Sequence, residues 1–218
     1  MRRFFVACVV LTVLAAATAR AETWDVANDF SNTNGNPNGA WSYGTLSSSN
    51  NFQFTLDTDA EDYFNNSLCP GWYGYDGCVW KNTTPIAAFS VAPGQISLCA
   101  ATWRGGTVDI RWTAPTDLEV EVAGQFYPEY GSAANAIYVD GTGQGQSSYL
   151  SDAGAGAFDF TVAVTAGETI DFAATSNYGN SPLTATITTV PEPGSLALLA
   201  TGLLGLLACV WRRRRQAV

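Results

Sequence analysis

The sequence predicts an all-β body, a single antiparallel β-sandwich of jelly-roll-like outline, with one hydrophobic helix at each end of the 218-residue chain. Apolar and polar residues alternate with a period of two through much of the central region, as in strands with one buried and one solvated face. Turn residues such as Gly, Pro and Asn separate these segments. Because no central stretch keeps a helical period, about eight short strands favour a sandwich.

The N-terminus has the three parts of a secretory signal peptide. Arg2 and Arg3 precede an uncharged run over 4–19, and Ala19 and Ala21 give a small-residue cleavage pattern. We therefore predict a cleavable signal helix over residues 1–21, with the cut after Ala21. An N-terminal membrane anchor is the alternative, but the apolar core is shorter than the ~20 residues that a span needs.

Residues 22–190 form the predicted sandwich domain, with no repeat and no internal linker. Alternation is clearest at 108–112, 118–122, 158–164 and 170–172. Weaker strand candidates are 52–56, 86–91, 136–140 and 183–189. Residues 31–50 are rich in Asn, Ser and Gly, which predicts a long loop with Trp41 and Tyr43 turned inward.

Charge and composition exclude several functions. Only Lys81, Arg104 and Arg111 are basic within 22–190, whereas all 19 acidic residues except Glu192 lie there, which gives 3 − 18 = −15. Such a domain cannot displace counterions from a nucleic acid, so no nucleic-acid partner is expected. The chain has no histidine, which removes histidine-based triads and histidine metal sites.

The C-terminus predicts a transmembrane helix over residues 195–211. This stretch carries no charge, and seventeen residues at ~1.5 Å each span about 25 Å. Four arginines follow directly and would stay on the cytoplasmic side: Arg212, Arg213, Arg214 and Arg215. Just before the helix, two prolines around Glu192 keep the chain extended. One interpretation of this segment is a plain single-pass membrane anchor.

Residues 191–218 together resemble a PEP-CTERM sorting signal, which combines Pro-Glu-Pro, a short hydrophobic helix and a terminal arginine cluster. In that family exosortase, a membrane enzyme of Gram-negative bacteria, cuts the tail near the tripeptide. The resemblance implies that Pro191, Glu192 and Pro193 are recognition residues of a substrate. It also implies export by the general secretion machinery, a precursor held in the inner membrane, and release to the cell surface or extracellular matrix.

A weaker resemblance concerns the body. Residues 28–31, the run NPNGAWSYG over 36–44 and the stretch 108–126 are similar to β-sandwich domains of exported bacterial proteins, which are related to galactose-binding-like and carbohydrate-binding modules. The resemblance implies a sandwich fold and favours sugar binding, but it transfers no binding residue.

Cys69 and Cys78 bracket a turn-rich loop, and an exported protein meets an oxidising compartment. We therefore predict a disulfide between them, which leaves Cys99 as the odd thiol of the body. Metal binding competes with this interpretation, but three scattered cysteines without histidine make a poor zinc site, so no metal ligands are assigned.

The same loop holds the candidate sugar-binding residues Trp72, Tyr75 and Asp76, because flat rings on a constrained loop suit sugar stacking. The alternative is that these rings pack in the core. The acidic run 57–62 places oxygens at alternate positions but has Asp62 where a calcium EF-hand needs Gly, and Leu68 where it needs Glu. A solvated turn is the default there, with room for a loosely bound calcium ion and no other cofactor.

No nucleophile motif or phosphate loop accompanies these acids, so we do not expect an enzyme. The sequence predicts an exported, non-catalytic structural or binding sandwich of the cell surface or matrix. The alternative is a carbohydrate-binding module attached to extracellular polysaccharide, and a glycan hydrolase ranks third.

Overall fold

The computed structural model describes residues 21–47, 53–100, 106–127, 133–140, 147–152, 156–176 and 179–190, together with Gly202, Leu204 and Gly205. Thr23–Thr189 forms one compact unit, and the two terminal segments fall outside it. All of the strands belong to the Thr23–Thr189 unit.

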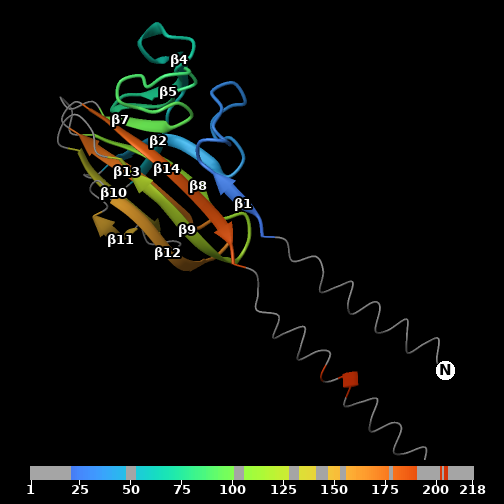
Figure 1. Cartoon of the computed structure of the whole chain (residues 1–218). Coiled ribbons are helices and arrows are strands. Elements are labelled where there is room, and N and C mark those ends of the chain that lie inside the picture. The colour runs from blue at the N-terminus through green and yellow to red at the C-terminus, as the bar shows by residue number, and fades with distance from the viewer. Residues whose placement is uncertain are drawn as a thin grey trace, which may run out of the picture. The chain divides into compact units, whose positions relative to one another are not determined.

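The first sheet runs in the order β12-β9-β14-β7-β6-β5-β4 (Figure 1). Along one edge, the long strand β14 pairs with β7 in its first half and with β1 in its second half. The strands are β1 (Thr23–Asp25), β4 (Asp59–Asp62), β5 (Pro70–Gly74), β6 (Gly77–Lys81), β7 (Ile96–Ala100), β9 (Leu118–Phe126), β12 (Gly156–Val164) and β14 (Gly179–Thr189).

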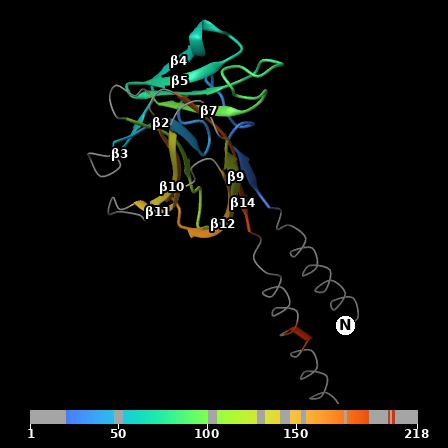
Figure 2. The same ribbon diagram turned by 60° about the vertical axis from the view of Figure 1, so that its left-hand side comes forward.

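The second sheet runs in the order β11-β10-β13-β8-β2-β3, and Figure 2 shows it as a layer apart from the first. Every strand pair of both sheets is antiparallel, which confirms the all-β prediction and agrees with a β-sandwich. The strands are β2 (Trp41–Ser47), β3 (Gln53–Leu56), β8 (Thr107–Thr113), β10 (Ala133–Asp140), β11 (Ser147–Asp152) and β13 (Thr169–Ser176).

The main core fills the space between the sheets with alternate residues of each strand. Val108, Ile110 and Trp112 of β8 are fully buried there, and β9 adds Val120 and Val122. This follows from the period of two, because successive side chains of a strand point to opposite faces. The clean alternation that predicted these strands is therefore the pattern of a sheet with one face against the core.

A second, smaller core lies on the other side of the first sheet. Along β6, Val79 belongs to the main core, whereas Cys78 and Trp80 belong to the second. The other buried residues of the second core are Tyr63 from a short 3-10 turn, η1 (Tyr63–Asn65), Cys69 just before β5, and Val91 from the loop between β6 and β7. Asn82 organises that loop, because its side-chain amide donates hydrogen bonds to the carbonyls of Ile86 (3.0 Å) and Val91 (2.7 Å).

Three sequence-based expectations differ from the structure. Residues 86–91 form a turn closed by the Ala88–Val91 bridge rather than a strand. Residues 41–47, predicted as loop, form β2, although Trp41 and Tyr43 do point inward as expected. The predicted loop over 70–80 is the β5–β6 hairpin, with Tyr75 and Asp76 at its two-residue turn.

The terminal predictions fall mostly outside the described residues. Residues 1–20, including Ala19, and the segments that hold Pro191, Glu192, Pro193 and the arginines 212–215 are not described. Of the predicted membrane helix 195–211, Gly202, Leu204 and Gly205 are described, and these are helical. Within the described part of the chain, no helix has the length and apolar character needed to cross a bilayer.

Asp57 is buried at the end of β3, under the β5–β6 hairpin. Its backbone N–H donates to the Tyr43 carbonyl (3.0 Å), and one carboxylate oxygen has no hydrogen-bond partner. Burial, and then the nearby charges of Asp76 and Asp59, raise the pKa of Asp57 to about 7. Burial likewise raises the pKa of Asp109, with Asp171 as the next cause.

We predict that Asp57 makes the fold less stable as pH rises from about 4 to 7. The folded-state pKa lies above the unfolded value, so in this window the folded protein holds a proton that the unfolded chain has lost, and the free energy of unfolding falls with pH. Asp57→Asn should raise stability at pH 7.5 by about 2–4 kcal/mol and flatten this slope, with a residual slope from Asp109. Urea unfolding between pH 4 and 8 measures both effects, and parallel curves for the two proteins would contradict the prediction.

Candidate functional site

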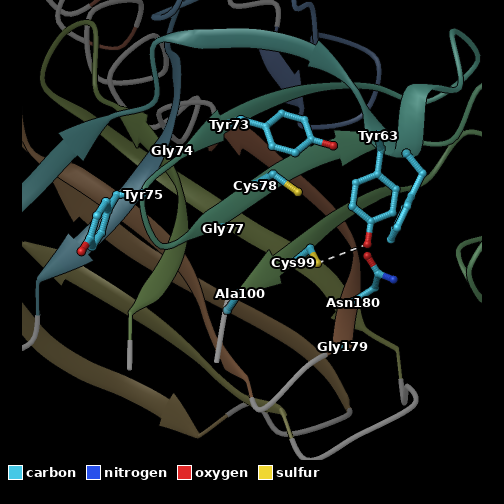
Figure 3. A pocket seen from close by; sticks show the side chains of 11 residues that line it. Tyr63, Tyr73, Gly74, Tyr75, Gly77, Cys78, Cys99, Ala100, Gly179 and Asn180 are labelled. Carbon is cyan, nitrogen blue, oxygen red and sulfur yellow. Dashed lines mark hydrogen bonds between the residues drawn. The ribbon is translucent and has the colours of Figure 1, made fainter. Parts of the chain in front are cut away.

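A pocket of about 450 Å³ opens beside the second core, between η1, the β5–β6 hairpin, β7 and the start of β14 (Figure 3). Four aromatic residues and several glycines line it, with few polar groups. This combination is typical of small-molecule sites, which are concave and mostly apolar. The lining residues are Tyr63, Phe64, Tyr73, Gly74, Tyr75, Gly77, Cys78, Cys99, Ala100, Gly179 and Asn180.

Ring contacts connect the pocket to the second core. Tyr63 stacks on Trp80 with ring centroids 4.4 Å apart and 7° between the planes. Tyr63 also meets Phe64 edge-on at 4.7 Å and Phe89 edge-on at 5.2 Å. Phe64 and Phe89 stack on each other at 4.9 Å and 22°. The buried Tyr63 ring thus holds a second, outer pair of rings in place.

That outer pair is exposed, and its backbone is strained. Phe64 is 69 % exposed and Phe89 47 %, while their φ angles of 52° and 50° lie in the left-handed region. For a bulky residue this conformation is an outlier that costs of order 1–3 kcal/mol. Asn65 and Ser90 share it, with φ of 57° and 65°. Surrounding bonds therefore determine where the two rings stand.

The polar groups of the pocket are uncharged, and the amide of Asn180 already makes hydrogen bonds within the protein. The amide oxygen of Asn180 accepts from the Trp80 indole N–H (2.8 Å), and the Asn180 amide N–H donates to the Phe89 carbonyl (3.4 Å). Burial is the main cause that raises the pKa of Tyr63 and Tyr73 far above the ordinary phenol range. Both hydroxyls therefore keep their protons at neutral pH.

Tyr75 supplies an exposed ring at a distance from Tyr63. It is 74 % exposed at the tip of the β5–β6 hairpin, and Figure 3 shows the two tyrosines toward opposite ends of the pocket. A ligand that touched both would have to be extended.

The structure separates the three predicted sugar-binding residues. Trp72 is 5 % exposed in the main core, and its indole N–H donates to the Ser31 carbonyl (2.8 Å), so the prediction of Trp72 as a sugar platform is wrong. Asp76 does not line the pocket, and its side chain lies against Gly106. Of the three, Tyr75 alone is exposed at the site.

Sequence reasoning did not identify most of the aromatic residues in and beside the pocket. Tyr63 and Phe64 follow the acidic run directly, in a stretch that showed no strand pattern, and Phe89 lay within a predicted strand. The signal that could have indicated them is a pair of large apolar residues in an otherwise acidic and Asn-rich segment. Such residues on a turn need either a second core or a ligand.

The predicted Cys69–Cys78 disulfide is absent, and all three body cysteines are thiols in the structure. Cys78 lies opposite Tyr73 in the hairpin, and Cys69 is four residues before Tyr73. At about 3.3 Å per residue the two cysteines are some 13 Å apart, beyond the ~7 Å that a disulfide allows. The hairpin, rather than a loose loop, keeps them apart.

The acidic run forms the exposed strand β4 after the buried Asp57. A polar hollow of about 460 Å³ beside it is lined by Ala60, Glu61, Asp62 and Asn65. Among the described residues no three carboxylate or thiol groups come together as a metal site. A loosely bound calcium ion at this run stays a prediction.

Comparisons with known proteins confirm the resemblance of the tail. Residues 189–215 match the PEP-CTERM protein-sorting motif. The motif implies export, membrane anchoring before processing, and exosortase as the processing partner. No curated protein matches the chain.

Solved structures similar to the chain include carbohydrate-binding modules. A variant of CBM29-2, from family 29, has 10 % identity and a TM-score of 0.35, and the match covers 78 % of this chain and 92 % of that one. A CBM35 from Paenibacillus barcinonensis has 14 % identity and a TM-score of 0.28, over 76 % and 97 % of the two chains. An arabinose-bound GH51 arabinofuranosidase has 8 % identity and a TM-score of 0.30, over 72 % and 27 %. These TM-scores are too low to carry an argument about ligand or chemistry.

We predict that Trp72 is a structural residue. Trp72→Ala should cost about 3–5 kcal/mol of unfolding free energy, because it removes a large side chain from the main core. Trp72→Phe should cost less, since most of the volume remains. Chemical denaturation measures both, and a Trp72→Ala protein as stable as the parent would contradict this assignment.

Proposed function

We propose that the exported domain is a non-catalytic binding module of the cell surface or extracellular matrix, and that its aromatic pocket binds a neutral polysaccharide chain. The observation that carries the proposal is the exposed, stacked Phe64–Phe89 pair, held in a strained backbone beside the pocket. Strain and exposure of large apolar rings both cost stability, so their retention favours a binding role.

The chemistry of the pocket suits a sugar. The C–H groups of a pyranose face carry partial positive charge and stack on the electron-rich faces of aromatic rings. Phenol hydroxyls, such as that of Tyr75, can exchange hydrogen bonds with sugar hydroxyls. Because Tyr75 stands away from Tyr63, a chain of several sugar units would reach more of the site than one sugar.

Charge selects a neutral ligand over an acidic one. None of the described residues that line the pocket is Asp, Glu, Lys or Arg. Residues 22–190 carry a formal charge of −15, which repels polyanions such as uronic-acid polymers. An acidic polysaccharide would meet this repulsion, and none of the described lining residues is a basic group that could offset it.

The described lining residues of the pocket include no pair of carboxylates such as a glycosidase uses. Most glycoside hydrolases place two carboxylates on either side of the scissile bond. The acids nearest in sequence to the lining, Glu61, Asp62 and Asp76, are not among the lining residues. This arrangement favours binding over hydrolysis.

The sorting tail places the module where it would meet its ligand. In this proposal the precursor is held in the inner membrane by residues 195–211 and is then cut near Pro191, Glu192 and Pro193. The released domain would join the cell surface or matrix and meet extracellular polysaccharide there. Binding at the pocket would retain the domain there after its anchor is lost.

We expect Phe64→Gly and Tyr75→Ala each to weaken polysaccharide binding at least about tenfold, the equivalent of one aromatic stacking contact. Phe64→Gly also removes the unfavourable left-handed conformation of a bulky residue, so the variant should fold as stably as the parent. The measurement is affinity electrophoresis of the exported protein through gels containing neutral glucans, mannans or galactans, with alginate as the anionic comparison.

Ile86→Ala is the matched control, because Ile86 is 70 % exposed and does not line the pocket. It should leave retention unchanged. Parent protein that no neutral polysaccharide retards would contradict the binding proposal and leave a structural sandwich. Release of sugar products from the same panel would instead establish a hydrolase.

We also expect the tail to be removed in the native host. Intact mass of the exported form should end near 190–193. Glu192→Ala should leave the uncut form in the inner membrane, whereas Glu119→Ala, an exposed carboxylate of β9, should be processed normally. A parent protein that is exported with Arg212–Arg215 still attached would contradict sorting by this tail.

A further inference from the structure

Cys78 and Cys99 face each other across two neighbouring strands. They are direct Cα partners in the antiparallel β6–β7 pair. Opposite residues in such pairs have Cα atoms about 4.5–5.5 Å apart, which falls within the 4.4–6.8 Å range of disulfides. Both side chains point to the second core and line the pocket. Bond formation therefore requires no change of register.

The two thiols already interact. The neighbouring Cys78 thiol is the largest cause that lowers the pKa of Cys99 to about 7, and the Tyr63 hydroxyl acts in the same direction against burial. The Tyr63 hydroxyl lies 3.3 Å from the Cys99 sulfur (Figure 3). The same thiol pair and burial raise the pKa of Cys78. Cys99 is thus the nucleophile of the pair, since the thiolate is the reactive form.

We infer that Cys78 and Cys99 are joined by a cross-strand disulfide in the exported protein, at the wall of the aromatic pocket, while Cys69 stays a thiol. The inference rests on strand register and side-chain direction. It does not depend on the proposed sugar binding.

The bond forms by thiol–disulfide exchange with a reactive disulfide of the exported compartment as oxidant. The Cys99 thiolate attacks one oxidant sulfur, which gives a mixed disulfide and expels the other oxidant sulfur as a thiolate. Cys78 then loses its proton and attacks the Cys99 sulfur, which expels the second oxidant thiolate. Two cysteine thiols are oxidised to one disulfide, and the oxidant disulfide is reduced to two thiols that take up the two protons.

Access and distance select this pair over the alternatives. Cys99 is partly exposed at the pocket, so an oxidant can reach it, whereas Cys78 is 3 % exposed and can be reached by its neighbour. Cys69 is fully buried and lies some four residues along the strand from the position opposite Cys78. Burial, and then Asp62, raise the pKa of Cys69, which keeps it a thiol.

The disulfide would close a ring of about 20 residues that includes the β6–β7 loop and Phe89. Such a ring stabilises chiefly by restricting the unfolded chain. It also restrains the loop that carries one of the two exposed rings. Because Cys99 borders the pocket, the bond stays within reach of a soluble dithiol, and exposed disulfides are the more reducible ones.

The test is peptide mapping of the full chain after export to an oxidising compartment, with thiols blocked by N-ethylmaleimide in acid before digestion. We expect one linked peptide pair containing Cys78 and Cys99, and alkylated Cys69. Reduction should lower the thermal midpoint by about 5–10 °C.

Three variants separate the pairings. Cys69→Ser should retain the linked pair and the sensitivity of the midpoint to reductant. Cys99→Ser should lose both and leave Cys78 alkylated. Full alkylation of all three cysteines in the parent, or any linkage through Cys69, would overturn the inference. Cys78→Ser should likewise lose the linked pair and leave Cys69 and Cys99 alkylated, and a Cys69–Cys99 linkage in that variant would also overturn the inference. None of these results depends on whether the pocket binds a polysaccharide.

Discussion

The strict alternation of side chains along the β5–β6 hairpin is the constraint on which the rest of the domain depends. Trp72 and Val79 point into the main core, while Tyr73, Cys78 and Trp80 point to the opposite face. A single hairpin thereby serves two cores, and a slip of one residue would exchange every one of these side chains. The pocket exists because the second face of the hairpin is covered only in part, by η1 and the β6–β7 loop.

The same alternation explains which strands the sequence could predict. β9 and β12 each have one buried and one largely solvated face, so their apolar residues recur at every second position. β8 keeps the same alternation because polar Asp109 and Arg111 occupy its second face, although Asp109 is buried there. β2 was missed because its residues are buried on both faces and include Ser, Gly and Thr, which also suit a loop. Residues 86–91 gave the opposite error, because they were predicted as a strand and form a turn over the second core. A short apolar run in such a turn has the same pattern as a buried strand.

The site was harder to predict than the fold because it depends on contacts across the sequence. Tyr63 and Trp80 stack although seventeen positions separate them, and Asn180 reaches the same cluster from β14. Local spacing indicated an aromatic loop near Trp72 but not which of its rings would be buried. Period two decides this once the hairpin register is known: Trp72 goes inward, and Tyr75 at the turn remains outside.

Backbone strain and the contacts that offset it are concentrated in the segments around the second core. Among the described residues, all four non-glycine positions with positive φ lie in the segments that cover the second core: Phe64, Asn65, Phe89 and Ser90. A core of five buried residues gains little hydrophobic free energy to offset strain at four positions. Support must therefore come from directional contacts, namely the Asn82 and Asn180 hydrogen bonds and the stacked Tyr63 and Trp80 rings. A covalent link between β6 and β7 would act where this support is thinnest, because it fixes the two strands from which the strained β6–β7 loop leaves and to which it returns.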